Sequence, residues 1–197
     1  MPIDMQHHRR SIRLPDFDYS GPGVYFVTLV AQGRGCLFGE IKDGVMVLSA
    51  IGGIAKEHWR AIPDHFKMVE LGAHVVMPNH MHGIIIIRDT NVGATTTNMV
   101  GATHRPALQR VARMGDMERA SHWDAPTKGS LGAIIGAYKM SVTRRVRREL
   151  DDPAPVWQRN YFEHVIRNDE EHSRIHEYIE SNIENWAQDD ENPMRLV

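Results

Sequence analysis

The feature that most constrains the fold is residues 75–87, where two apolar runs flank a Pro-Asn turn and a His-Met-His triplet. Ile84 to Ile87 form an unbroken β-branched run, which is typical of a buried strand. Neighbouring side chains of a strand point to opposite faces, so residues two apart share a face. We therefore expect His80 and His82 to project together, beside the turn at Pro78-Asn79.

This histidine pair has two interpretations. Two imidazoles can be an ordinary polar pair on a half-exposed sheet face. They can also converge on one divalent metal ion, because strand ends often carry binding sites and a rigid strand holds both rings. The residues of the strand leave both interpretations open.

Composition narrows the class of protein. The chain has 197 residues, of which 42% are hydrophobic and 24% charged, as expected of one globular domain. Its N-terminal segment is polar and basic, unlike a secretory signal, and no apolar run approaches the roughly 20 residues that cross a bilayer. Cys36 is the only cysteine, which excludes an internal disulfide and multi-cysteine metal sites. A metal site would use histidine, asparagine and carboxylate ligands.

Local patterns predict a mixed α and β chain. Strands are expected at 24–30, 68–77 and 80–88, a hairpin with an Asp-Gly turn at 41–48, helices at 49–62, 131–150 and 168–186, and an extended stretch at 157–165. Ser130 and Asn168 are the expected N-caps of the last two helices. We expect a basic N-terminal arm at 1–20, one domain at 21–188 with a flexible insert at about 89–129, and a C-terminal tail at 189–197.

The last helix carries polar residues on its inward stripe. The stripe comprises Ile175, Tyr178, Ile179, Asn182, Ile183 and Trp186, at the spacing of one helical face. Tyr178 and Asn182 are i and i+4 neighbours, so they present a phenol and an amide to the same place. One interpretation is a core aromatic beside a bracing amide. The other is a nucleophile beside a third metal ligand, which with the histidine pair would suit Mg²⁺ or Mn²⁺.

Basic residues form two clusters, at 7–13 and at 139–148, although the net charge is −2 and the pI about 6.6. A solvated face explains either cluster alone. A phosphate-bearing substrate explains why both clusters occur together with a metal-like site.

Four segments together resemble a known family. They are Pro-Asn-His-Met-His-Gly before an apolar strand, Leu-Gly-Ala-Ile-Ile-Gly-Ala-Tyr-Lys at 131–139, the aromatic stretch at 156–168, and the Tyr178 helix. Their order and spacing are similar to those of the HUH-type single-tyrosine transposases, in particular the REP-associated tyrosine transposases, from about residue 10 to residue 186 apart from the insert. The resemblance implies an α+β fold, with a ferredoxin-like antiparallel sheet and helices packed on one face.

The resemblance implies a substrate, single-stranded or hairpin DNA, which suits basic side chains that contact phosphates and aromatic rings that stack on bases. The candidates for phosphate contacts are Arg9, Arg10, Arg13, Lys139, Arg144, Arg145, Arg147, Arg148 and Arg159, and those for stacking are Trp157 and Phe162.

The resemblance also implies an activity. His80, His82 and Asn182 would hold the divalent metal, and Tyr178 would attack a DNA phosphate to give a 5′-phosphotyrosine and a free 3′-hydroxyl. Tyr138 and Tyr161 compete as nucleophiles, although Tyr138 lies on an apolar stripe with Val142 as its i+4 neighbour. Family members commonly have proline after the asparagine, whereas Asn182 is followed by Ile183, so the helix is expected to continue to residue 186.

Three functions remain for this sequence. The first is a metal-dependent transposase-like endonuclease and strand transferase, the second a non-catalytic DNA-binding regulator, and the third a metal-dependent phosphodiesterase that uses water. The expected partner is single-stranded or hairpin DNA, with no membrane, and both a monomer and a homodimer agree with the resemblance. We expect a cytoplasmic protein that associates with the nucleoid when bound to DNA.

Overall fold

The computed structural model describes residues 21–89, 129–189 and 192–193. The basic arm at 1–20 with Arg9, Arg10 and Arg13, nearly all of the insert, and most of the C-terminal tail lie outside the described residues. The predictions for these segments, and the division into domains, therefore stay predictions.

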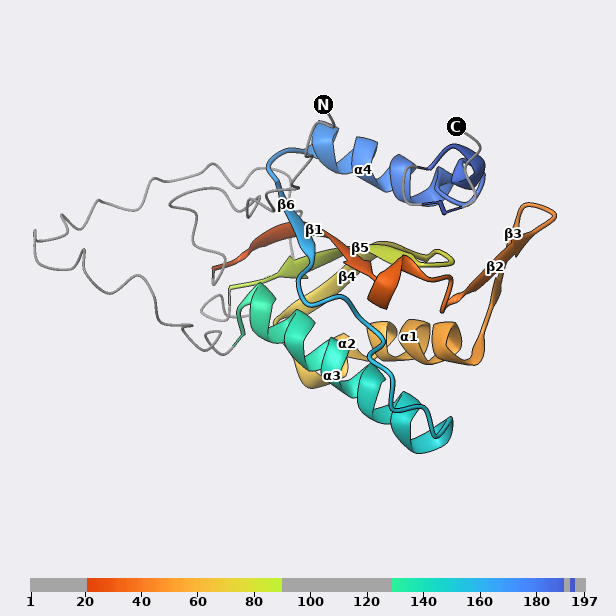
Figure 1. Cartoon of the computed structure of the whole chain (residues 1–197). Helices are drawn as coiled ribbons and strands as arrows, with labels where there is room; N and C mark the ends of the chain where they lie inside the picture. The colour runs from red at the N-terminus through yellow and green to blue at the C-terminus, as the bar shows by residue number, and fades with distance from the viewer. Residues whose placement is uncertain (1–20, 90–128, 190–191, 194–197) are drawn as a thin grey trace, which may run out of the picture.

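A four-stranded antiparallel sheet forms the centre of the molecule, in the order β4-β5-β1-β6 (Figure 1). Its strands are β1 (Gly23–Val30), β4 (Val69–Val76), β5 (His80–Ile87) and β6 (Phe162–Ile166). Helices α1 (Ala50–Arg60) and α3 (Leu131–Glu149) connect them in the order β-α-β-β-α-β, which is the ferredoxin-like pattern. The predicted α+β class is confirmed.

Helices cover both faces of this sheet. With the short α2 (Ile62–His65), α1 and α3 lie on one face, whereas α4 (Asp169–Ser181) lies on the other (Figure 1). The prediction of helices on one face is wrong because both faces of β5 are apolar. Ile85 packs in the large core under α1 and α3, and Ile84 in a smaller cluster with Ile179 of α4. Each face therefore needs a cover.

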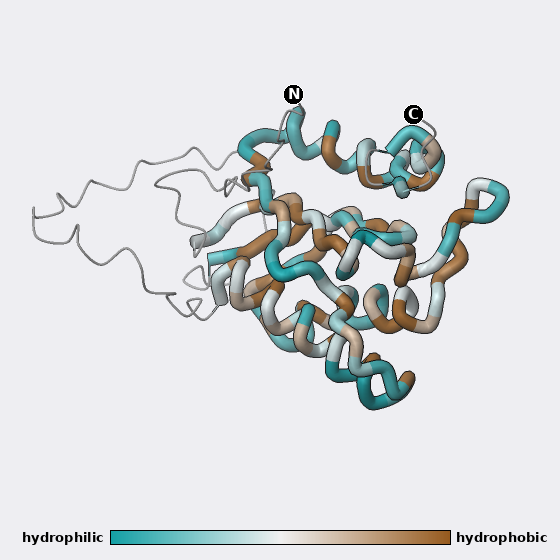
Figure 2. Tube along the Cα trace, in the orientation of Figure 1, coloured by the Kyte–Doolittle hydropathy of each residue, from teal (hydrophilic) through white to brown (hydrophobic). Residues whose placement is uncertain are grey.

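Local sequence signals account for the element boundaries. The Asp43-Gly44 turn, with φ of 52° and 74°, joins β2 (Gly39–Lys42) to β3 (Val45–Leu48). Ser49, Ser130 and Asn168 each accept a hydrogen bond from the backbone N–H three residues later, at the starts of α1, α3 and α4. Figure 2 shows the hydrophobic stretches in the central sheet and the hydrophilic C-terminal end of α3.

The C-terminal elements are shorter than expected. The last helix ends at Ser181 instead of residue 186, and a 3₁₀ turn, η2 (Trp186–Gln188), follows. The last turn of α4 carries Glu180 and no basic residue, which is unfavourable at the negative end of the helix dipole. Of the extended stretch at 157–165, only the part from Phe162 is a strand, and Trp157 forms an isolated bridge with Ala31. No helix among the described residues is long and apolar enough to span a membrane.

Candidate metal and nucleophile site

The histidine pair lies at the start of β5, on the face covered by α4. Antiparallel pairing places His80 beside Val30 and His82 beside Thr28 of β1. Both histidines are buried, with 0% and 5% of their surfaces exposed. The prediction that their side chains share one face of the sheet is confirmed, because their Nε2 atoms lie 3.0 Å apart.

Each imidazole is held at its other nitrogen. Asn79 Nδ2 donates to the Arg34 carbonyl (3.2 Å), which orients the Asn79 amide so that Oδ1 accepts from His80 Nδ1–H (2.9 Å). Thr28 Oγ1 lies 2.8 Å from His82 Nδ1. With both Nδ1 atoms engaged, both Nε2 atoms are directed into the same space, the arrangement that second-sphere partners give to metal-binding histidines.

Both imidazoles are neutral near pH 7. Burial lowers the pKa of His80 to about 4, with Asp189 opposing the shift and Arg34 adding to it. Burial, together with the nearby His80, lowers the pKa of His82 well below its ordinary value. Since His80 carries its proton on Nδ1, the 3.0 Å contact requires His82 Nε2–H to donate to His80 Nε2. If the His82 proton moves to Nδ1, where Thr28 Oγ1 can accept it, a cation between the rings would meet two Nε2 lone pairs.

The pair fits a divalent cation in spacing. Metal–nitrogen bonds of about 2.1 Å at adjacent corners of an octahedron place the two nitrogens about 3.0 Å apart. No group of three or more His, Cys, Asp or Glu residues that could hold a metal occurs in the described part of the chain. Further ligands would therefore come from amide oxygens or water.

Asn182 offers such an amide. It follows the last residue of α4, is 2% exposed, and its Oδ1 has no hydrogen-bond partner among the described residues. Tyr178, one turn earlier, packs against the His82 ring at 5.3 Å, and Trp186, one turn later, lies 6.0 Å from the His80 ring. Asn182 lies in the chain between these two residues, and its buried oxygen, which has no partner among the described residues, has the chemistry of a third ligand.

Tyr178 combines exposure with contact to the pair. Its hydroxyl lies 3.3 Å from His82 Nε2, while 47% of the residue's surface is exposed. Its ring also meets Phe26 edge-on, with the ring centres 6.2 Å apart. The Tyr178 hydroxyl therefore lies between the buried histidine pair and solvent.

The two competing tyrosines lie elsewhere. Tyr138 is buried under α1, where its hydroxyl donates to the Ala55 carbonyl (3.0 Å), and burial raises its pKa well above the ordinary value. Tyr161 packs against the large core, and its hydroxyl oxygen is buried. Neither hydroxyl is open to a DNA phosphate.

Several predicted DNA contacts have structural roles instead. Trp157 is 7% exposed and packs against Phe38, with ring centres 4.9 Å apart, so the prediction that it stacks on bases is wrong. Its place in an aromatic and basic stretch suggested an exposed ring, but the bridge to Ala31 turns it into the core. Lys139 Nζ donates to the carbonyls of Gln158 (2.8 Å) and Asn160 (2.7 Å), and burial lowers its pKa to about 8.

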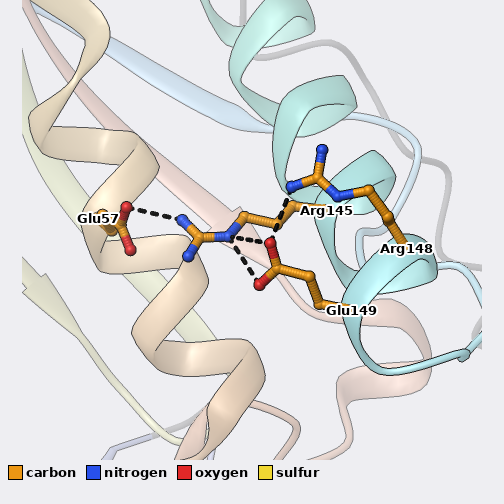
Figure 3. Close-up of polar contacts among 4 residues, drawn as sticks. All are labelled: Glu57, Arg145, Arg148 and Glu149. Carbon is orange, nitrogen blue, oxygen red and sulfur yellow. Dashed lines mark hydrogen bonds and ion pairs between the residues drawn. The ribbon is translucent and has the colours of Figure 1, made fainter.

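The α3 arginines divide into two groups. Arg145 bridges Glu57 of α1 (2.7 Å) and Glu149 (3.0 Å), and Arg148 joins Glu149 at 2.8 Å (Figure 3). These charges are already paired, whereas Arg144, Arg147 and Arg159 line a groove beside α3. Phe162 lies on the α4 face, 37% exposed, near Phe26.

Sequence reasoning missed Thr28, and it treated Asn79 only as a turn residue. Thr28 is recognisable only once β1 is known to pair with β5, because the alignment Thr28–His82 is a long-range register. Asn79 had a local signal, since an amide directly before the first histidine can reach that ring, as it does here.

Comparisons with known proteins show the family and the fold of the chain. No family model matches the chain. An uncharacterized protein of Haemophilus influenzae is 36% identical over 186 residues, which is 93% of this chain and 92% of that protein. The solved structure of a REP-associated tyrosine transposase bound to a REP hairpin matches with a TM-score of 0.52 and 16% identity, over 87% of this chain and 72% of that chain. The resemblance inferred from the motifs is confirmed in the fold. The chain belongs to the same family as the H. influenzae protein and has the fold of a REP-associated tyrosine transposase.

Proposed function

We propose that the protein is a metal-dependent DNA transposase-like endonuclease and strand transferase that acts on single-stranded or hairpin DNA. The observation that carries the proposal is the position of the Tyr178 hydroxyl, which lies 3.3 Å from His82 Nε2. That nitrogen in turn lies 3.0 Å from His80 Nε2. The solved transposase of the same fold, which is bound to a hairpin, supports DNA as the partner. We place the activity in the cytoplasm, on nucleoid DNA.

The proposed reaction transfers a phosphoryl group to the protein. The Tyr178 oxygen forms a bond to phosphorus as the bond from phosphorus to the 3′-oxygen breaks, leaving a 5′-phosphotyrosine and a 3′-hydroxyl. The phenolic proton leaves to solvent, which Tyr178 reaches, and the departing oxygen gains a proton. Attack by a DNA 3′-hydroxyl on the phosphotyrosine reverses these bonds and joins strands.

The residues around the tyrosine prepare this step. His80, His82 and Asn182 would hold Mg²⁺ or Mn²⁺, which would polarise the scissile phosphate and favour attack by a phenol whose ordinary pKa is near 10. Thr28 and Asn79 hold the two imidazoles in position through their Nδ1 atoms. Phe26 and His82 fix the Tyr178 ring, which limits the directions from which its hydroxyl can attack.

A covalent-capture experiment tests the proposal. The protein is incubated with Mn²⁺ and labelled DNA hairpins whose single-stranded flanks are randomised, and the products are separated on a denaturing gel. We expect a protein–DNA adduct that EDTA and Tyr178→Phe both abolish, while Tyr161→Phe retains it. No cleavage would indicate the non-catalytic DNA-binding regulator, and cleavage without an adduct would indicate the phosphodiesterase that uses water. Either result would overturn the proposal.

A further inference from the structure

Helix α4, which forms the outer layer on its face of the sheet, carries two histidines that the proposed reaction does not use (Figure 1). His172 and His176 are i and i+4 neighbours, so they lie one above the other on one side of the helix. Tyr178 follows His176 by two residues, which turns its side chain to a different side. The pair is therefore separate from the site under α4.

The two rings lie close together and are only partly buried. Their centres are 6.2 Å apart at an interplanar angle of 41°, and the His172 ring forms no hydrogen bond or ion pair with a described residue. Zinc–nitrogen bonds of about 2.1 Å at a tetrahedral angle place two imidazole centres about 5 Å apart. Small rotations about the side-chain bonds of these half-buried residues supply the difference.

The charges around the pair favour a cation. Glu180 Oε2 lies 3.5 Å from His176 Nδ1. A carboxylate beside one ring nitrogen leaves the other, Nε2, for a metal and strengthens it as a ligand. Leaving its histidines out, α4 has five acidic residues and one basic residue, which gives a net charge of −4. Such a helix repels a DNA phosphate and attracts a divalent cation.

The ligand types select the metal. Two histidines at i and i+4 on one helical face bind Zn²⁺, whereas Mg²⁺ prefers oxygen ligands and Mn²⁺ binds a given site more weakly. Water would fill the remaining positions, because the described residues hold no group of three His, Cys, Asp or Glu residues that could bind a metal. Ser173 stands where the His-Glu-x-x-His metalloproteases have their glutamate base, so the pair offers metal binding without hydrolysis.

We propose that His172 and His176 form a second metal site, which takes Zn²⁺ or a similar transition-metal ion and links two turns of the helix that carries Tyr178. Ile179 is the one buried residue of α4, and a helix of 13 residues is marginal without packing. A metal bound to successive turns stabilises the folded helix, because it binds that form and not the unfolded one. The site stands whether or not Tyr178 is a nucleophile.

Zinc titration against a composition-matched variant tests the site. Ser173→His/His176→Ser keeps two histidines on α4 but makes them sequence neighbours, which do not face each other. The buried pair at residues 80 and 82 is present in both proteins, so a difference between them comes from α4. In isothermal titration calorimetry, one Zn²⁺ ion should bind on the order of a hundredfold more weakly to the variant, because the second imidazole no longer acts intramolecularly. His172→Gln should show the same loss.

Hydrogen exchange locates the ion. In His80→Gln/His82→Gln protein, which lacks the buried pair, Zn²⁺ at about ten times its Kd should slow amide exchange in α4 by about tenfold and leave α3 unchanged. Adding Ser173→His/His176→Ser should remove this protection, while the urea midpoint without zinc should stay the same. Equal zinc affinity in the unmodified and the composition-matched proteins, or protection of α4 that persists in the latter, would overturn the site.

Discussion

The helices on the two faces of the sheet cover different kinds of surface. Under α1 and α3, large side chains such as Trp59, Tyr138 and Leu131 close a continuous apolar core. Under α4, a small cluster that includes Phe26 and Ile179 gives way to buried histidines and a half-exposed tyrosine. The first face holds the sheet together, and the second uses that rigidity to position polar groups. Substitutions on the two faces should therefore separate stability from activity.

The largest stability effect is expected from Trp59→Ala on the α1 and α3 face. Trp59 is fully buried, so truncation should lower the free energy of unfolding by about 3–5 kcal/mol. Tyr178→Phe, on the other face, should change it by less than about 0.5 kcal/mol. Urea unfolding of both variants measures this difference. A Tyr178→Phe protein as unstable as Trp59→Ala would contradict the prediction.

A smaller effect, confined to the α4 face, is expected from Thr28→Val. The variant keeps the side-chain shape and loses the hydrogen bond at His82 Nδ1, so Mn²⁺ should bind about 10- to 100-fold more weakly. Isothermal titration calorimetry measures the change in Kd. Thr143→Val, which removes a hydroxyl bonded to the Lys139 carbonyl on α3, is the matched control and should bind Mn²⁺ as the unmodified protein does. Equal affinity in the Thr28 variant would contradict the positioning role.

The pH dependence of stability should report the cost of burying the histidines. The pKa of His80 is about 4 in the folded protein and 6.5 ordinarily, so between these values the unfolded chain binds more protons. Stability should therefore be full above about pH 6.5 and fall as the pH drops towards 4. Urea midpoints at pH 7.5 and 5 measure the fall, and His80→Gln should reduce it. An identical pH slope in that variant would refute the assignment.

The smallest effect is expected at the start of α4. Asn168→Ala removes the side-chain acceptor of the Glu171 N–H and should cost about 1 kcal/mol. Ser130→Ala, at the start of α3, makes the same test on the other face. Because Tyr178 lies in the second half of α4, adduct formation should survive Asn168→Ala. Loss of the adduct there would mean that the whole helix, and not its contact with His82, positions the hydroxyl.

Much of the fold was predictable because its signals are local. The Asp43-Gly44 turn, the caps Ser130 and Asn168, and the isoleucine run of β5 each act within a few residues. The cover on the second face was not predicted, although the consecutive isoleucines imply two apolar faces. The end of α4 was misplaced because the apolar stripe continues past Ser181 while the charge of the last turn opposes a helix.

The site was predictable only where its residues lie on one element. Strand periodicity predicts that His80 and His82 share a face, and helix periodicity predicts the same of Tyr178 and Asn182. That the two pairs form one site was implied by the family resemblance. Thr28 depends on strand register, and the burial of Trp157 depends on its bridge to Ala31, neither of which a local pattern encodes. The metal and the remaining DNA contacts stay predictions.

The central claim is that Tyr178 is the nucleophile, and peptide mapping of the covalent adduct tests it most directly. After adduct formation with Mn²⁺ and nuclease trimming, trypsin cleavage places Tyr178, Tyr161 and Tyr138 in three separate peptides, 175–195, 160–167 and 129–139. We predict that mass spectrometry finds the nucleotide remnant on peptide 175–195. A remnant on either of the other two peptides would contradict the account.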